Sequence, residues 1–600
     1  MSESLGAHAT GDGVRFAVLS RGASAVWLCI SEDGEETRAA MARDGDIWRA
    51  EVPGGEAGMR YGFRADGPPE LHFDPSKLLV DPYAVEIDRP FTYDERLAMR
   101  GQDTGALVPW GVVSRAAAGP PPPPPLFQPG GLIYELSVRS FTMRHPAVPE
   151  AQRGTIGALA HPAVIAHLKT LRVAAVELMP IVAWIDERHL PPLGLINAWG
   201  YNPVVPMALD PRLAPGGVAE LRDTVAALRG AGIGVILDLV FNHSGESDGQ
   251  GPTLSLRGLD EALYYMHAPD GTLVNDTGTG NTLDCSEPAV RHLVLESLRH
   301  FARLGVDGFR FDLAPVLARH PGFDPHAPIF AEIAADPLLA GRVMIAEPWD
   351  VGPDGYQLGR FPDGWLEWND RFRDDVRRFW RGDGDAGVLA TRLAGSSDIF
   401  GGKATRTVNF VAAHDGFALA DVAAYEHRRN HANGEGNRDG TADNASWNNG
   451  VEGPSDDPRV LGRRATDVRA LLATLFASKG TIMLTAGDDF GRTQGGNNNA
   501  YAQDNATTWL DWEVRDTELE AYVAALAEAR ANWPLVDPTF ITDGDWRDLA
   551  GQPMTPEGWA RADGFELRLP GAGNGQPVLR VDRSARRVTF THAQAMESRP

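Results

Sequence analysis

The feature that most constrains the fold is an alternation of short apolar segments with amphipathic stretches, which begins at Gly131. Between the apolar segments lie stretches with helical periodicity, such as 219–229 and 290–304. Strands that alternate with helices over this length predict a parallel sheet. We expect strands at residues 132–138, 174–179, 234–240, 308–313, 343–346, 407–411 and 481–484. The period alone does not separate a closed (β/α)8 barrel from an open doubly wound sheet. No glycine-rich dinucleotide fingerprint follows the first strand, which weakens the open-sheet interpretation.

The segments on either side of this region have the short-strand pattern of β-domains. Residues 13–90 alternate apolar and polar side chains between turn signals, which predicts an N-terminal β-sandwich. A proline run at 120–125 predicts a stiff spacer. A helical stretch at 516–532 precedes further strand-like runs at 565–569, 578–581 and 588–591. We therefore predict four parts: a β-sandwich at 1–118, a proline-rich linker at 119–129, the strand–helix region at 130–512, and a small C-terminal β-domain at 513–600.

Charge and cysteine content restrict the partners and the compartment. The formal net charge is −25, so the surface repels phosphate backbones and anionic membranes, whereas a neutral polymer meets no such repulsion. The two cysteines, Cys29 and Cys285, do not form a disulfide framework, which fits a reducing compartment. Residues 1–13 lack a secretory pattern, and the longest apolar stretch, 173–185, is too short to span a bilayer. We expect a cytoplasmic protein that binds neither nucleic acid nor membrane.

Charged side chains end several of the expected strands. Asp238 lies in one strand, Arg310 and Asp312 in the next, Glu347 follows another, and the pair at 414–415 follows a fourth. A single charged residue at such a place is often only a loop anchor. Four such ends in one chain favour a catalytic site, because barrel enzymes assemble their sites from the carboxyl ends of several strands.

The types of residue at these strand ends suit glycoside hydrolysis, which needs two carboxyl groups across one bond. Arg310 is two residues from Asp312, so on a strand both point to the same side, and the cation keeps Asp312 ionised for attack. Glu347 precedes Pro348 and Trp349, and an apolar neighbour helps to keep an acid protonated. Asp415 could bind sugar hydroxyls. A structural ion pair explains Arg310 and Asp312 equally well at this point.

Other candidate sites are weaker. His427 and His431 have the spacing of a metal pair on a helix, but no third acidic ligand is evident in their Asn/Gly-rich surroundings. We see no other metal cluster and no cofactor motif, so we expect neither metal nor cofactor. Trp199 and Tyr201 lie in a polar loop, where aromatic rings are available to stack on sugars.

Four segments in this order resemble the signature regions of the α-amylase superfamily, glycoside hydrolase family 13. They are 238–243 (DLVFNH), 308–312 (GFRFD), 346–349 (AEPW) and 413–415 (AHD). The resemblance implies a (β/α)8 TIM barrel with Asp312 as nucleophile, Glu347 as acid/base and Asp415 as the third carboxylate. It also implies further residues that contact the sugar at the cleavage point: Arg310, His243 and His414, with Tyr134 stacked beneath it. We add four substrate-binding candidates: Trp199, Tyr201, Asp238 and Trp349.

Finer motifs resemble the isoamylase-type bacterial glycogen debranching enzymes of this superfamily. They lie at 199–202, 278–283, 352–357, 433–440 and 491–501. The N-terminal segment resembles the glycogen-binding module of that group, with matches at 61–64 and 77–83. The similarity runs from about residue 13 to 512 and more weakly to 559. Four positions depart from the expected pattern: Ser137 replaces histidine, His431 and Asp489 replace glutamate, and Ala502 replaces cysteine.

The resemblance implies an α-1,6-glucosidase that debranches glycogen or limit dextrin with retention of configuration. Three alternatives stay open: a branching transglycosylase, a trehalose-releasing hydrolase, and a catalytically inactive glycogen-binding protein. The three intact carboxylates argue against the last. The loop motifs argue against the first two by family analogy alone. The expected partner is glycogen or another branched α-glucan, and the sequence does not indicate the oligomeric state.

Overall fold

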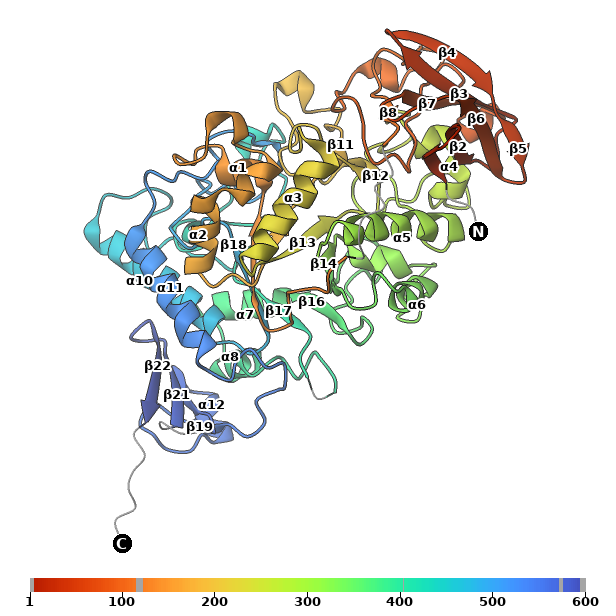
Figure 1. Cartoon of the computed structure of the whole chain (residues 1–600). Helices are drawn as coiled ribbons and strands as arrows, with labels where there is room; N and C mark the ends of the chain where they lie inside the picture. The colour runs from red at the N-terminus through yellow and green to blue at the C-terminus, as the bar shows by residue number, and fades with distance from the viewer. Residues whose placement is uncertain (1–4, 115–121, 403, 571–575, 594–600) are drawn as a thin grey trace.

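The computed structural model describes residues 5–114, 122–402, 404–570 and 576–593, and its centre is a closed barrel of parallel strands (Figure 1). The barrel confirms the predicted (β/α)8 fold and excludes the open sheet. Its strands, in spatial order, are β9 (Leu132–Leu136), β10 (Ala175–Leu178), β13 (Gly234–Leu239), β14 (Gly308–Phe311), β15 (Val343–Ala346), β16 (Trp365–Asn369), β17 (Thr407–Asn409) and β18 (Thr481–Thr485), which pairs with β9 again.

Helices pack around the barrel because each strand turns alternate side chains outward. The helices are α1 (Val138–Thr142), α2 (Pro162–Thr170), α3 (Gly217–Gly230), α4 (Leu256–Tyr264), α5 (Pro288–Arg303), α6 (Pro328–Ala335), α7 (Asp370–Arg381), α8 (Ala386–Leu393), α9 (Leu419–Val422), α10 (Pro458–Phe476) and α11 (Thr517–Ala531). The inward-facing apolar side chains form a separate core inside the barrel: Ile133, Ala175, Ile236, Ile345, Leu366, Trp368, Val408, Phe410 and Met483. A short antiparallel pair, β11 (Val182–Trp184) and β12 (Pro203–Leu209), follows β10.

One barrel strand, β16, was absent from the sequence expectations. It is a short segment with two tryptophans, Trp365 and Trp368. No α-helix separates it from β15, so the strand–helix alternation that marked the other seven strands fails here. Only closure of the barrel, through pairing of β16 with β15 and β17, defines it as a strand.

The N-terminal strands form two antiparallel sheets, in the orders β1-β2-β6-β5 and β4-β3-β7-β8. Their bounds are β1 (Gly6–Thr10), β2 (Gly13–Leu19), β3 (Ala25–Glu32), β4 (Glu35–Ala40), β5 (Ala42–Asp44), β6 (Ile47–Pro53), β7 (Arg60–Asp66) and β8 (Gly111–Val112). This part packs on α4 of the barrel region. Asp260 accepts the backbone N–H groups of Arg21 and Gly22 at 2.7 and 2.8 Å, and Ser255 donates to the carbonyl oxygen of Val80 at 2.8 Å.

The expected linker and the C-terminal strands both contact the barrel. Residues 119–121 of the linker lie outside the described residues, and the carbonyl oxygen of Pro124 accepts a hydrogen bond from Arg229 at 2.7 Å. At the other end of the chain, four strands form an antiparallel sheet, with α12 (Pro556–Trp559) beside it. The strands are β19 (Asp545–Arg547), β20 (Gly564–Arg568), β21 (Gln576–Asp582) and β22 (Arg587–Ala593). Arg586 joins this sheet to α10 through an ion pair with Asp467 at 2.6 Å. No helix in the described parts of the chain is long and apolar enough to cross a membrane.

Candidate active site

Arg310 is the centre of the candidate site. Its side chain is fully buried, and β14 points it into the barrel. Nη1 lies 2.8 Å from Asp238 Oδ1 and 3.1 Å from Asp312 Oδ1, while Nη2 lies 3.2 Å from Glu347 Oε2. One guanidinium therefore holds three carboxyl groups that come from the ends of three neighbouring strands, as the motif spacing predicted.

The two expected catalytic carboxyl groups differ in their surroundings. Asp312 directly follows β14; its side chain is 13% exposed, and its Oδ2 accepts a hydrogen bond from Asn242 at 2.8 Å. Glu347 is only 4% exposed, and its Oε2 accepts the backbone N–H of Leu313 at 2.7 Å. Burial raises the pKa of Glu347 well above its ordinary value; Arg310 opposes this shift and the charge of Asp312 adds to it. The structure thus offers an accessible carboxylate beside a carboxyl group that favours its proton.

His414 and Asp415 occupy the loop after β17. Burial disfavours the imidazolium of His414, but Glu135, which receives its Nδ1–H at 2.7 Å, outweighs burial and raises the pKa of His414 to about 9. Asp415 lies close enough to raise the pKa of Glu347 and to act on the guanidinium of Arg373. Both residues therefore belong to the same charged cluster as Arg310.

Two aromatic rings from the loop before β12 cover this cluster. The ring of Tyr201 stacks on His414, with centroids 4.9 Å apart and an angle of 17° between the planes, and its hydroxyl donates to Asp238. Trp199 meets His414 edge-on at 5.0 Å. His243 is buried beside them, with Nε2 3.1 Å from the carbonyl oxygen of Tyr201, and burial lowers its pKa. The expected sugar-binding residues Trp199, Tyr201 and His243 are thus brought together.

Comparison with known proteins decides the family. Residues 4–84 match the model of carbohydrate-binding module 48, the isoamylase N-terminal domain. The glycogen debranching enzyme of Serratia proteamaculans is 46% identical over 93% of this chain and 89% of its own length. The enzyme of the same name from Yersinia enterocolitica is 45% identical over 94% and 90%. The chain belongs to the family of bacterial glycogen debranching enzymes.

Solved structures of more distant proteins share the fold of this family member. Pullulanase from Bacillus acidopullulyticus superposes with a TM-score of 0.73 at 22% identity, over 97% of this chain and 69% of that one. Type I pullulanase from Bacillus subtilis, complexed with maltose, gives a TM-score of 0.75 at 21% identity, over 97% and 79%. At sequence identities this low, the similarity to the pullulanases shows a shared fold.

The structure contradicts the role expected for Tyr134. Its side chain is fully buried, and its hydroxyl donates to Asp489 at 2.8 Å beside His167 of α2. In β9 the inward positions are Ile133 and Glu135, so Tyr134 between them points out of the barrel, toward the helices. The ring available to stack against a sugar at the charged cluster is that of Tyr201.

Sequence reasoning missed several residues of this family member's site. Glu135 pairs with His414, and its only sequence signal was an acid inside an apolar strand. Near the cluster, the hydroxyl of Tyr501 donates to Glu435 at 2.7 Å and lies 2.9 Å from His189 Nε2. Tyr501 and Glu435 fell within recognised motifs but received no role. Trp349 is partly buried against the core inside the barrel.

The four residues that depart from the family pattern make local contacts of their own. Ser137 caps α1, Asp489 binds Tyr134 and His167, and Ala502 is buried in a short helical turn. His431 is exposed, as is His427. Within the described residues, no group of three or more His, Cys, Asp or Glu side chains could hold a metal ion.

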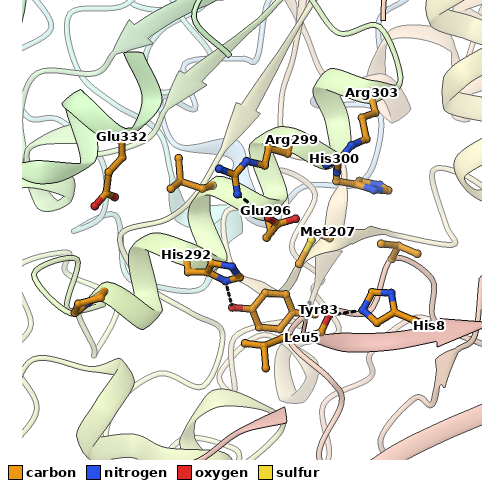
Figure 2. A pocket seen from close by; sticks show the side chains of 13 residues that line it. Leu5, His8, Tyr83, Met207, His292, Glu296, Arg299, His300, Arg303 and Glu332 are labelled. Carbon is orange, nitrogen blue, oxygen red and sulfur yellow. Dashed lines mark hydrogen bonds and ion pairs between the residues drawn. The ribbon is translucent and has the colours of Figure 1, made fainter. Parts of the chain in front are cut away.

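A cavity larger than those beside the charged cluster lies elsewhere, between the N-terminal sheets and α5 (Figure 2). It measures about 580 Å³, and Tyr83 and His292 meet across it, with the hydroxyl 3.0 Å from Nδ1. Two smaller cavities, of about 30 and 140 Å³, share Trp199 and Ser137 in their linings. These two lie beside the charged cluster, so cavity size does not identify the site in this chain.

Proposed function

We propose that this chain hydrolyses α-1,6-glucosidic branch linkages of glycogen or limit dextrin with retention of configuration. The supporting observation is a single guanidinium that contacts two carboxyl groups in different surroundings: Asp312, which is partly exposed, and Glu347, which is buried and has a raised pKa. Retaining glycosidases use such a pair, one as nucleophile and one as acid/base.

In the first step, the Asp312 carboxylate attacks the anomeric carbon as the bond to the branch oxygen breaks. Glu347 gives its proton to that oxygen, and a glycosyl ester on Asp312 forms. In the second step, Glu347 takes a proton from water, the water oxygen bonds to the anomeric carbon, and Asp312 leaves as a carboxylate. Arg310 holds the Asp312 carboxyl group in place through its contact at 3.1 Å.

The surrounding residues fit this assignment. Tyr201 offers a ring face to the sugar in the cleavage position, while Asp415 and His414 offer hydrogen bonds to its hydroxyls. Asp238 orients both Arg310 and Tyr201 through direct hydrogen bonds. The Trp199 ring borders the same position. The N-terminal module would add affinity for the polymer, and we place the enzyme in the cytoplasm, where glycogen is its partner.

Product analysis tests the proposal against its rivals. Purified protein would be incubated with branched limit dextrin, maltotriosyl-trehalose and linear amylose, and new reducing ends would be counted. Debranching predicts reducing ends from limit dextrin alone. Release of trehalose would support the trehalose-releasing hydrolase, and chain transfer without new reducing ends would support the branching transglycosylase. No reaction would support an inactive binding protein. Proton NMR at early times should show the α-anomer at the new reducing end; the β-anomer would contradict retention.

A further inference from the structure

Glu177 is a buried acid that the proposed mechanism does not use. It lies on β10 and is only 1% exposed. In the parallel register it is opposite Glu135 on β9 and Ile236 on β13, whose side chain belongs to the core inside the barrel. Glu177 therefore points into the barrel beneath the active site.

The charges around Glu177 disfavour its ionisation. The acids that act on it are Asp238 and Glu135, from the two neighbouring strands, and the cations are Arg310 and His414. Both cations are already engaged, because Arg310 binds Asp238 and His414 binds Glu135. Neither of the two cations that act on Glu177 is therefore free to pair with it. Burial, with the repulsion of the two acids added, raises the pKa of Glu177 well above its ordinary value.

Glu177 also lacks direct hydrogen bonds. Both of its carboxyl oxygens are buried without a partner among the described residues. Other buried donors in the same barrel also lack a hydrogen-bond partner, among them Arg310 Nε and Trp368 Nε1. The guanidinium lies over the Trp368 ring, 4.3 Å from its centroid. Buried polar groups nearly always find partners, and ordered water commonly bridges groups that do not touch.

We propose that Glu177 is a positioning residue: from beneath the site, its carboxyl group bridges through ordered water to Arg310 Nε and aligns that guanidinium with Asp312 and Glu347. The chemistry at the sugar is unchanged by this role. Glu177 touches no reacting atom and acts only through Arg310. The inference rests on the proposed hydrolase activity.

Two substitutions separate this role from a merely structural one. Glu177→Gln keeps the shape and the hydrogen-bonding capacity and has no charge at any pH. Glu177→Leu fills the same space without polar atoms and removes the proposed bridge to Arg310 Nε. Ile236→Val, at the position in register on β13, is the matched packing control.

Kinetics on a branched oligosaccharide and thermal unfolding would be measured for each variant. We expect Glu177→Leu to lower kcat by about tenfold or more, with KM changed by less than about twofold, at a temperature where thermal unfolding shows the variant to be folded. Glu177→Gln should keep kcat within about twofold of the wild type. Ile236→Val should lower Tm and leave kcat unchanged.

The pH profile of kcat tests whether Glu177 is neutral in the folded enzyme. Glu177→Gln removes no charge if Glu177 is neutral, so the alkaline limb of kcat, where Glu347 loses its proton, should stay at the same pH. A shift of that limb to lower pH would show that Glu177 carried a negative charge and would overturn the proposal. A Glu177→Leu variant with the kcat of the wild type would also overturn the proposal. If the Glu177→Leu variant fails to fold, the pH profile of kcat for Glu177→Gln still tests the proposal. A wild-type protein that releases no reducing ends would refute the proposed function instead.

Discussion

At the scale of single residues, two carboxyl groups of the same chemistry are given different roles by their surroundings. Asp312 is partly exposed and binds Arg310 and Asn242. Glu347 is buried, and its pKa is raised. The raised pKa of Glu347 arises from burial, to which the charges of Asp312 and Asp415 add and which Arg310 opposes.

Exchange of each acid for its amide should separate the roles. Asp312→Asn removes the nucleophile, so turnover of every α-glucosidic substrate should be lost. Glu347→Gln should lower the rate on natural branches by about 10²–10⁴. A glycosyl fluoride leaves without a proton, so the Glu347→Gln variant should still form the covalent ester and accumulate it. Mass spectrometry should find the sugar on the peptide that carries Asp312. Label on Glu347 or Asp415 would contradict the assignment.

The pair of His414 and Glu135 predicts a pH dependence of stability. In the folded protein the pKa of His414 is about 9, compared with an ordinary value of 6.5. Its stabilising contribution is therefore complete below pH 6.5 and is lost as pH rises through 9. Wild type should exceed His414→Gln in unfolding free energy by an amount that falls by about 1–3 kcal/mol between these values. Urea unfolding at several pH values measures the difference; a constant difference would contradict the pairing.

At the scale of elements, the loops after β17 and β18 are joined by buried amides. Asn430 Nδ2 donates to Asn498 Oδ1 at 2.8 Å, and the backbone N–H of Asn498 donates to Asn430 Oδ1 at 3.0 Å. Both side chains are buried. Tyr501 follows within the second loop, so this network places a residue near the charged cluster.

Loss of this amide network should loosen the loops and leave the barrel intact. Asn498→Ala removes the oxygen that accepts one Asn430 Nδ2–H and the amide that donates to Thr441 and Asn444, at a cost of about 1–3 kcal/mol. Limited proteolysis should then cut faster within 426–450, and KM for branched substrate should rise more than kcat falls. Asn448→Ala is the control, since that side chain binds Glu452 near the surface. Equal proteolysis of the Asn498 variant and the control would show that the network does not hold the loop.

At the scale of the whole molecule, the N-terminal module is packed against the barrel. Its apolar residues share one continuous core with the barrel helices, and α4 receives several of its hydrogen bonds. Removal of residues 1–118 would expose that core. The packing favours a structural contribution in addition to any binding of polymer.

A point substitution in the interface tests the module better than its deletion. Asp260→Ala removes the acceptor of two backbone N–H groups and should lower the unfolding free energy by about 1–3 kcal/mol. Binding of glycogen and hydrolysis of a short branched oligosaccharide should both persist below the unfolding temperature. Calorimetry measures the unfolding free energy, a sedimentation assay measures glycogen binding, and initial rates measure hydrolysis of the short substrate. If hydrolysis of the short substrate fell in step with glycogen binding at 25 °C, the module would be coupled to the site.

The sequence by itself predicted the strand–helix alternation, the two flanking β-domains and the charged strand ends, while closure of the sheet into a barrel was implied only by the family resemblance. Hydrophobic period and residue order are local properties, and parallel strands necessarily bring their carboxyl ends to one edge. Tertiary structure decided the rest. It made Trp365–Asn369 a strand through closure, turned Tyr134 outward while Tyr201 covered His414, and set Glu177 beside Glu135. These outcomes depend on strand register and on which side of a closed sheet a residue faces, and no local pattern specifies either.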